Sequence, residues 1–415
     1  MDRRDFLRLA ALAGVAVYAS GGRGASAGPL EADLSPYQGP FWVSIHVPGG
    51  WDPALLCDPK GSETGISKLY NESSILEVGG LRCAPVGSNA NFFKKYASRL
   101  CVINGIDTAT GTHDAGPAHV WSGTLRGGWP CFSAVAAASL GPLRPLSFIS
   151  NGGYDQTAGV VAKSVGNIAA VAGDPNIKDG GGATFHSPAT MNRIRGAQQA
   201  RLDALRTRQS LPALRRAAGE LYAARLTSAE LGELSATLPA TLSNNALVRQ
   251  AQLAFAAYKA GLAVSATLIA DVNVDTHTNH DVVHVAELTK AIDAIDLVIA
   301  EAEAFGIADA LVLSIGSDFG RGPSYNAQNG KDHYSITSMM FMGPGIPKGR
   351  VIGGTDDEGK PFKVNPSTLE RDDKAGVRIT PAHIHKALRA KAGVLGTGVD
   401  KAFPVFVSED MPLFG

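Results

Sequence analysis

Short apolar runs that end in glycine- or aspartate-rich segments recur along the chain and predict buried β-strands. Phe41–Val47 is followed by Pro-Gly-Gly-Trp-Asp, Leu100–Ile103 is followed by Asn-Gly-Ile-Asp, and Leu146–Ile149 is a third run of this kind. The apolar residues are continuous rather than alternating, which is typical of strands covered on both faces in a parallel sheet. The loops that follow such strands are where α/β proteins build their functional sites.

The second half of the chain has the pattern of a strand, a helix and a second strand. Ala263–Ile269 is a short apolar run, and from Val285 to Ala302 an apolar residue recurs at steps of three and four, which is one helical stripe. Gly306 is placed to end that helix, and Ala310–Ile315 is the next apolar run. This order predicts a parallel pair of strands joined by a right-handed crossover.

Between Pro188 and Leu242 the composition of the chain changes. Arg, Ala, Leu and Glu dominate there, and this predicts two or three surface helices. We expect them to form a small helical insertion at about residues 188–245. The sequence has no internal repeats, and residues 28–415 are otherwise expected to form one α/β domain.

The first 27 residues have the pattern of a twin-arginine export signal. Arg3 and Arg4 precede Phe-Leu, an uncharged stretch follows from Leu9 to Gly22, and Ala25–Ala27 offers small residues to a signal peptidase. This predicts the twin-arginine translocase as a partner and a periplasmic or extracellular mature protein. The alternative is a basic amphipathic helix at the N-terminus. The apolar stretch is too short for a conventional membrane span, and no later segment of the sequence is expected to form one.

The composition fits a globular protein and narrows the range of partners. Hydrophobic residues make up 45% of the chain and charged residues 18%, which is enough apolar material for a sizeable core. The formal net charge is +0, and because a nucleic-acid partner would need a basic face, none is expected. Two interpretations of the cysteines are open, one or two disulfides or buried free thiols. The cysteines are Cys57, Cys83, Cys101 and Cys131.

Aspartates and histidines gather in the segments that follow the predicted strands. They form four groups, which are Asp52, Thr112-His113-Asp114, the segment Asp275–Asp281, and Asp318 with Asp332-His333. The carboxyl ends of parallel strands face one crevice, so these groups are expected to converge there. Carboxylates and imidazoles are ligands of zinc, manganese and iron, and the spacing of Asp275 and His277 lets both turn toward one ion. A divalent metal site is therefore predicted at this edge of the sheet.

Each of these residues also has a purely structural interpretation. Asp52 precedes Pro53 and fits the cap of a turn or helix, and Asp114 and Asp281 are placed to cap the helices that follow them. His46 lies inside the first predicted strand and is expected on a covered face rather than in a site. The placement of the whole set after consecutive strands favours the functional interpretation.

Several motifs occur along the chain in the order found in a known family. They are Gly49-Gly50-Trp51-Asp52, Thr112-His113-Asp114 with Trp121-Ser122-Gly123, Val274-Asp275-Thr276-His277-Thr278-Asn279, Ser317-Asp318-Phe319-Gly320-Arg321, Asp332-His333 and Gly349-Arg350-Val351. Together with the signal, they resemble the exported bacterial family known as domain of unknown function 1501. That family is similar to the alkaline phosphatase and sulfatase superfamily, and the resemblance covers nearly the whole mature chain.

The resemblance implies an alkaline phosphatase-like fold, which is a three-layer α/β/α arrangement around a mostly parallel sheet. It also implies a metal site of aspartates and histidines at the carboxyl ends of the strands. The residues that match the ligand positions are Asp52, Asp275, His277, Asp318 and His333, with His280 as a substitute. The position that resembles the superfamily's nucleophile holds Thr112 or His113. Thr112 would act as the nucleophile if a metal removes its proton, and the alternative role for His113 is that of a metal ligand.

Two departures from the superfamily pattern bear on the number of metals. The superfamily usually has Asp-x-x-x-His in the middle segment and Asp-His in the next. Here Asp275 is two residues before His277, and Asp318 is followed by Phe319. Two interpretations of the site are open: it binds one metal, or it binds two metals with unusual ligands. No Cys-x-Pro-x-Arg motif occurs, so a formylglycine sulfatase is not expected.

The leading functional hypothesis is an exported metal-dependent hydrolase of small phosphate or sulfate esters. Zinc is the expected ion, with manganese, iron or calcium as alternatives. Arg321 is a candidate to bind an oxyanion because a guanidinium offers a bidentate fork, and its alternative role is a surface salt bridge. A second hypothesis, from a different class, is a non-catalytic envelope protein that keeps the fold for binding or structure.

Overall fold

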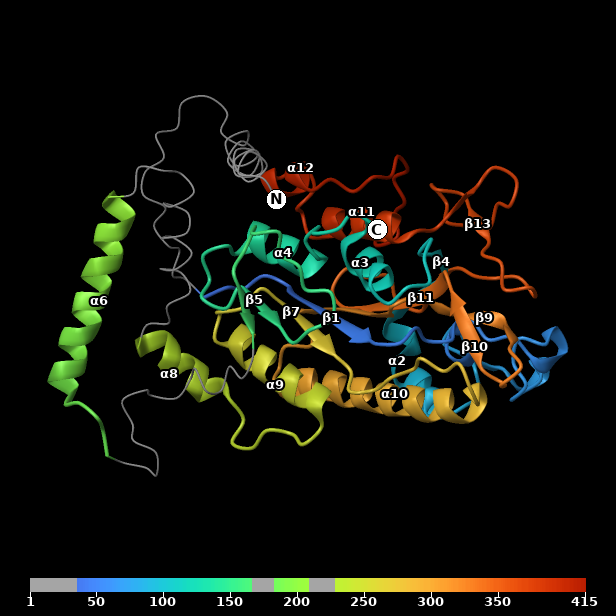
Figure 1. Ribbon diagram of the computed structural model, residues 1–415, viewed down its shortest axis with the longest axis horizontal. Coiled ribbons are helices and arrows are strands. Elements are labelled where there is room, and N and C mark those ends of the chain that lie inside the picture. Colours follow the sequence, from blue (N-terminus) through green and yellow to red (C-terminus); the bar gives the residue numbers. More distant parts are fainter. Residues whose placement is uncertain (1–35, 166–182, 209–227) are drawn as a thin grey trace.

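An eight-stranded sheet forms the centre of the molecule in the computed structural model, which describes residues 36–165, 183–208 and 228–415 (Figure 1). In spatial order its strands are β12 (Arg350–Gly353), β4 (Leu100–Asp107), β11 (Ile336–Met342), β8 (Leu311–Ser317), β1 (Phe41–Val47), β7 (Ser265–Ile269), β5 (Phe148–Ser150) and β6 (Lys163–Val165). β11 runs antiparallel to both of its neighbours, and the other seven strands run parallel to one another. The mostly parallel sheet predicted from the continuous apolar runs is confirmed.

Helices cover both faces of this sheet, so the molecule has three layers (Figure 1). One face carries α2 (Asn89–Tyr96), α9 (Ala246–Lys259) and α10 (His280–Ala304), and the other carries α3 (Ala115–Ser122), α4 (Phe132–Leu140), α11 (Pro381–Lys391) and α12 (Gly398–Ala402). Each face has its own hydrophobic core, because the sheet separates the two sets of buried side chains. The α/β/α architecture is as predicted.

The strand–helix–strand unit of the second half has the predicted elements but a different pairing. β7 and β8 are parallel, yet both pair with β1, which lies between them. The two strands are parallel, as predicted, but they are not direct neighbours, because the sequence of this unit contains no information about a strand inserted from the N-terminal half. β1 becomes the central strand, with neighbours on both sides that bring their following loops beside its own.

Helix α10 confirms the apolar stripe from which it was predicted. Leu288, Ile292, Ile295 and Ile299 are buried on the side that faces the sheet. The helix starts earlier than the stripe, at His280, and two histidines of its first turns, His280 and His284, are also fully buried. Their burial places two imidazoles in the protein interior, next to the loop that follows β7.

Smaller elements extend from the ends of the sheet. The hairpin of β9 (Gly320–Tyr325) and β10 (Lys331–Tyr334) follows β8 directly, and two further two-stranded pairs are β2 (Leu76–Val78) with β3 (Leu81–Cys83) and β13 (Lys363–Val364) with β14 (Val377–Arg378). In the segment where a helical insertion is expected, α6 (Pro188–Arg208) lies away from the sheet and α8 (Ser228–Thr237) packs near α9 (Figure 1).

The predicted export signal, residues 1–27, lies outside the described residues. Among the helices that the structure does describe, none combines the length and the apolarity needed to span a membrane. The four cysteines all lie in described segments, where each is buried and free, so of the two interpretations the free thiols hold.

Candidate metal centre

Four loops meet at one edge of the sheet, beyond the carboxyl ends of the parallel strands β1, β4, β7 and β8. Each loop follows its strand within a few residues, which places Asp52, His113, Asp275 and Asp318 at the same edge. The approach of the β1 loop to the β7 loop depends on Gly49, which has φ +110° and where a Cβ would lie 2.5 Å from the Asp275 backbone nitrogen. The predicted convergence is therefore real, but it produces two separate clusters.

The first cluster, the Asp275 cluster, consists of Asp275, His113, His277 and His333. The Asp275 carboxylate has His113 Nε2 at 3.2 Å from Oδ2, and on Oδ1 it has His277 Nε2 at 3.0 Å and His333 Nε2 at 3.1 Å. His277 Nε2 and His333 Nε2 are 3.0 Å apart. The cluster is open to solvent, since His113 and His277 are exposed and Asp275 and His333 are partly buried.

Each of the three imidazoles is held through its other ring nitrogen by an acceptor. Nδ1 of His113 lies 2.6 Å from Asp318 Oδ2, Nδ1 of His277 lies 3.0 Å from Asp332 Oδ1, and Nδ1 of His333 lies 2.6 Å from a backbone carbonyl, that of Gly111. Ionised carboxylates and carbonyls accept hydrogen bonds and do not donate them, so we assign the proton of each neutral ring to Nδ1. In this tautomer Nε2 of each ring carries a lone pair and no proton, and all three Nε2 atoms face the Asp275 carboxylate.

Three lone pairs and a carboxylate repel one another unless a cation lies among them. Nitrogen ligands sit about 2.0–2.1 Å from zinc, and two ligands of a tetrahedral zinc are therefore roughly 3.3 Å apart. Asp275 Oδ1, His277 Nε2 and His333 Nε2 form a triangle with edges of 3.0, 3.0 and 3.1 Å. His113, Asp275 and His333 also each place a ligand atom within 4.8 Å of the others. Both the donor atoms and their spacing fit a divalent metal.

Arg321 fixes Asp275 from the protein side. Its Nη2 lies 2.7 Å from Asp275 Oδ1, its Nε donates to the Gly50 carbonyl at 2.8 Å, and its Nη1 donates to the Lys331 carbonyl at 3.1 Å. Partial burial acts to raise the pKa of Asp275, but hydrogen bonds from Arg321 and His333 and the Arg321 charge lower it to about 2. Arg321 is fully buried, so the surface salt bridge considered for it is wrong, and most of its donors are used inside the protein.

Asp318 positions His113 and is itself held by a chain of contacts through β1. His46 Nε2 lies 3.0 Å from Asp318 Oδ1, off the line of a good hydrogen bond, and Trp121 Nε1 donates to His46 Nδ1 at 3.0 Å. Burial acts to raise the pKa of Asp318, but His46, His113 and the Gly49 amide lower it. Asp318 was predicted as a metal ligand and follows its strand as expected. Its carboxylate instead contacts Nδ1 of His113, the ring nitrogen that faces away from the Asp275 cluster, so it orients a candidate ligand.

The second cluster is buried and centres on Asp52. Its Oδ1 accepts the Ala54 amide at 2.9 Å, which is the capping role considered from the sequence. Its Oδ2 lies 2.6 Å from Lys331 Nζ and 3.0 Å from His280 Nε2. Burial acts to raise the pKa of Asp52, but the Lys331 ammonium and the His280 contact hold it far below its usual range. Three protein donors therefore occupy most of the acceptor sites of this carboxylate, including both on Oδ2.

A closed ring of hydrogen bonds runs through this cluster, and we call it the Asp52 ring. The Asp52 backbone N–H donates to His284 Nε2 at 2.9 Å, and His284 Nδ1 lies 3.0 Å from Thr276 Oγ1. Thr276 Oγ1 is 2.7 Å from His280 Nδ1, and His280 Nε2 returns to Asp52 Oδ2. One assignment of protons satisfies every member. Asp52 and His280, which were predicted as metal ligands, are therefore occupied here and lie apart from the Asp275 cluster.

Thr112, the predicted nucleophile, lies on the open side of the site next to His113. Its side chain is exposed, and its Oγ1 is 3.3 Å from Thr110 Oγ1 and accepts a long hydrogen bond of 3.4 Å from the Ala115 amide. Asp114 occupies the N-cap position of α3 without a capping hydrogen bond from its side chain. The Thr112 hydroxyl therefore faces solvent without a base on it among the described contacts.

Sequence reasoning missed several residues that build the two clusters. His46 was set aside as a strand residue, although it reaches Asp318. Lys331 gave no signal, because lysine is almost never fully buried. His284 could have been found, since it lies four residues after His280 on one helix and must share its face. Asp332 was noted beside His333 but was not assigned the role of holding His277.

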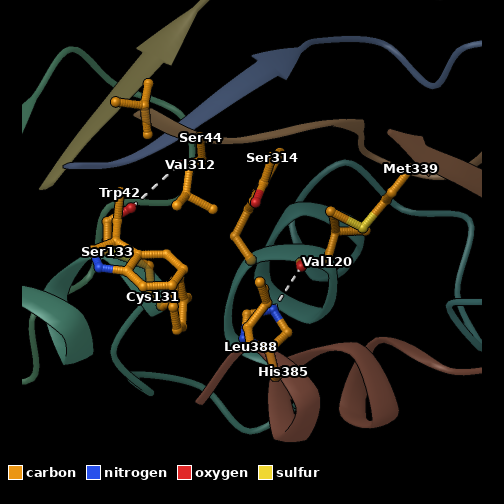
Figure 2. Close-up of a pocket in the computed structure, with 13 residues that line it drawn as sticks. Trp42, Ser44, Val120, Cys131, Ser133, Val312, Ser314, Met339, His385 and Leu388 are labelled. Atoms are coloured by element: carbon orange, nitrogen blue, oxygen red, sulfur yellow. Dashed lines mark hydrogen bonds between the residues drawn. The ribbon is translucent and has the colours of Figure 1, made fainter. Parts of the chain in front are cut away.

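A separate cavity lies inside the core between β1, α3, α4 and α11 (Figure 2). Its volume is about 10 Å³, which is room for a single water molecule. Ser44 Oγ and Ser133 Oγ are 3.3 Å apart at one end, and at the other His385 Nε2 lies 2.8 Å from the Val120 carbonyl (Figure 2). A cavity of this size excludes an organic substrate.

Comparison with known proteins identifies a family whose function is unknown. A family model described as "Protein of unknown function (DUF1501)" matches residues 80–371. No curated protein matches the chain.

Solved structures similar to the chain include a sulfatase, a lipoteichoic acid synthase and an alkaline phosphatase. A 2-O GAG sulfatase has a TM-score of 0.35 and 11% identity, over 86% of this chain and 71% of that one. The lipoteichoic acid synthase of Listeria monocytogenes has a TM-score of 0.39 and 9% identity, over 97% and 80%. A TAB5 alkaline phosphatase variant with Mg bound has a TM-score of 0.33 and 13% identity, over 74% and 92%.

Proposed function

This chain belongs to the DUF1501 family of proteins of unknown function, and on that premise we propose that it is an exported, metal-dependent hydrolase of phosphate or sulfate esters. The observation that carries the proposal is the convergence of three imidazole Nε2 atoms on the Asp275 carboxylate, at 3.0 to 3.2 Å. Imidazoles arranged in this way, each held through Nδ1 by an oxygen, are typical of metal ligands.

The metal would be held by Asp275, His277 and His333, with His113 as a further ligand. A donor set dominated by imidazole favours zinc over calcium, which prefers oxygen ligands, and manganese or iron are the alternatives. A divalent metal there would lower the pKa of a bound water and neutralise charge on a phosphoryl or sulfuryl oxygen.

The surrounding residues would hold the ligands and their protons in place. Asp318 and Asp332 keep the Nδ1 protons of His113 and His277, which leaves Nε2 free in both rings. Arg321 keeps Asp275 ionised and prevents its rotation, and this is a positioning role rather than the oxyanion binding first considered. The exposure of His113 and His277 leaves room on the solvent side for a small anionic ester.

Thr112 is the candidate nucleophile on this open side. A threonine hydroxyl is a poor nucleophile until a metal or base removes its proton, so its activation would depend on the bound ion. The position just before α3 also offers backbone N–H groups to an anion.

Export by the twin-arginine route is part of the proposal. The support is the arrangement of Arg3, Arg4, the uncharged stretch and Ala25–Ala27 in the sequence. A protein exported in the folded state can be loaded with its metal beforehand. The double variant Arg3→Lys/Arg4→Lys should leave the precursor inside the cell, and normal periplasmic accumulation of that variant would contradict the assignment.

The enzymatic proposal is tested by assaying the zinc-loaded protein against aryl phosphate monoesters, phosphate diesters and sulfate esters. Turnover that His333→Ala removes would support it. Turnover that persists in Thr112→Ala would keep the hydrolase and assign the attack to water. A metal-loaded protein that is inactive on the whole panel would favour the non-catalytic binding protein.

A further inference from the structure

We propose that the Lys331 ammonium is an internal cation that fills the Asp52 ring, so that the chain binds one divalent metal rather than two. Asp52 becomes a metal ligand only when this ammonium is removed. The inference rests on the metal centre of the proposed function and goes beyond it by fixing the number of ions. It concerns a second cation position, buried behind the Asp275 cluster.

The first support is that the donor atoms of the ring are those of a metal site. Asp52 offers a carboxylate, and the rings of His280 and His284 lie with their centroids 4.4 Å apart beside it. Carboxylate and imidazole are the usual ligands of zinc, manganese and iron. A cation is already present among these groups, since Lys331 Nζ lies 2.6 Å from Asp52 Oδ2.

The second support is the charge balance of the ring. All of its members are buried, with exposed fractions of 0% for Lys331, His280 and His284 and 1% for Asp52. The ring of assigned protons leaves both imidazoles neutral, so the ammonium balances the Asp52 carboxylate. A divalent ion entering this space would add two uncompensated positive charges at a buried site, which is strongly unfavourable.

The third support is that Lys331 is anchored where it is. Its amide donates to the Thr276 carbonyl at 3.1 Å, and its own carbonyl accepts Arg321 Nη1 at 3.1 Å. Its ammonium also lies 5.1 Å from the centre of the Tyr325 ring. The first two contacts fix the backbone of Lys331, and the ring of Tyr325 lies beside its ammonium. The Lys331 ammonium therefore stays in the ring and does not admit another cation.

Removal of Lys331 changes this balance in a predictable way. In Lys331→Ala the Asp52 carboxylate loses its counter-ion and gains the space of the missing side chain. A buried carboxylate without a counter-ion takes up either a proton or a cation. A shift of the His280 proton from Nε2 to Nδ1, which lies 2.7 Å from Thr276 Oγ1, would free His280 Nε2 as a second ligand beside Asp52. We therefore expect the variant to bind a second equivalent of zinc.

The experiment counts zinc bound per chain in the full purified protein, by titration with Zn²⁺ and by elemental analysis. Wild type should bind one equivalent, Lys331→Ala two, and Lys331→Ala/Asp52→Asn one. Lys60→Ala is the matched control, because Lys60 is also buried in a pair with an aspartate, Asp58, at 2.8 Å, whose other partner is the Thr355 hydroxyl. This variant should still bind one equivalent.

A fold check by circular dichroism accompanies each variant. If Lys331→Ala does not fold, Asp52→Asn/Lys331→Met removes both charges together and should bind one equivalent with the affinity of wild type. Two equivalents in wild type, a single equivalent in folded Lys331→Ala, or zinc lost from the double variant would each overturn the inference. If wild type binds no zinc, the proposed metal centre is wrong. The inference about the ring is still tested in that case, because Lys331→Ala should then bind one equivalent more than wild type.

Discussion

The Asp52 ring and the Asp275 cluster share two stretches of chain, residues 275–284 and 331–333, yet they use histidine in opposite ways. In the ring, every ring nitrogen of His280 and His284 has a partner of matching type, and the Lys331 charge balances Asp52. In the Asp275 cluster, the three Nδ1 atoms are satisfied and the three Nε2 atoms face a carboxylate. The first arrangement is complete as it is, and the second fits the metal that we propose.

The difference comes from which side of the chain each residue faces. Thr276 belongs to the ring, and its neighbours Asp275 and His277 belong to the open cluster, as expected for alternation along an extended segment. Lys331 and His333 are two residues apart and would share a face in a regular strand. The pairing of β9 with β10 shifts register between them, and this irregularity sends them to different clusters.

The comparison teaches that residue type alone does not define a metal ligand. A histidine whose two nitrogens both have protein partners is structural, even beside an aspartate. A histidine whose outer nitrogen has no proton to share and faces a carboxylate is expected to be a ligand.

The same substitution in the two clusters should have very different effects on folding. Asp52→Ala leaves the Lys331 ammonium buried without a partner, and we expect the free energy of unfolding to fall by about 3–5 kcal/mol. Asp275→Ala in metal-free protein removes a partly exposed carboxylate, and a loss of about 1 kcal/mol is expected. Urea unfolding with excess chelator measures both. Equal losses would remove the distinction between a structural and a ligand aspartate.

Loss of a proposed ligand should act on the metal rather than on the fold. His333→Ala is expected to weaken zinc binding by more than the roughly 10–100-fold that loss of an orienting group causes. His385→Ala is the control, because His385 is buried and bonded to the Val120 carbonyl, away from both clusters. Calorimetric zinc titration compares the two variants. Zinc affinity that is unaltered in His333→Ala would exclude it as a ligand.

Asp332, the hydrogen-bond acceptor of His277, should affect zinc affinity although it is not a proposed ligand. Asp332→Ala removes the oxygen that lies 3.0 Å from His277 Nδ1, and its expected cost is about 10–100-fold in zinc affinity. Asp332→Asn keeps an oxygen acceptor and should recover part of that affinity. If Ala and Asn bind zinc equally well, the hydrogen bond has no orienting role.

The ring should also make the metal-free protein sensitive to mild acid. Burial, with His280 adding to it, lowers the pKa of His284 well below its ordinary value of 6.5. The unfolded chain therefore binds a proton that the folded chain does not, so stability is full above about pH 6.5 and declines as the pH falls below it. The expected slope for this one group is about 1.4 kcal/mol per pH unit. His284→Gln should reduce the slope between pH 6 and pH 5, and an unchanged slope would refute this origin.

Much of the fold and part of the site could be predicted from the sequence. The buried strands were predictable because continuous apolar runs have few other structures available. Asp275, His277, His333 and His113 were predictable as a group because strand ends converge. The assignment of Asp52 and His280 to the metal failed for a physical reason, since a linear sequence does not show which face of a loop is turned inward. The register shift beside Lys331 left no signal at all.

The four buried cysteines have a consequence for following how the molecule opens. Burial raises the pKa of Cys57, Cys101 and Cys131 to about 12 and that of Cys83 to about 11, so the reactive thiolate is suppressed in the folded state. Cys57 and Cys83 lie in the core on one face of the sheet, and Cys101 and Cys131 lie in the core on the other. The chain thus carries two pairs of natural labels, one for each layer. The order in which an alkylating reagent modifies them would reveal whether the two layers separate together or one after the other.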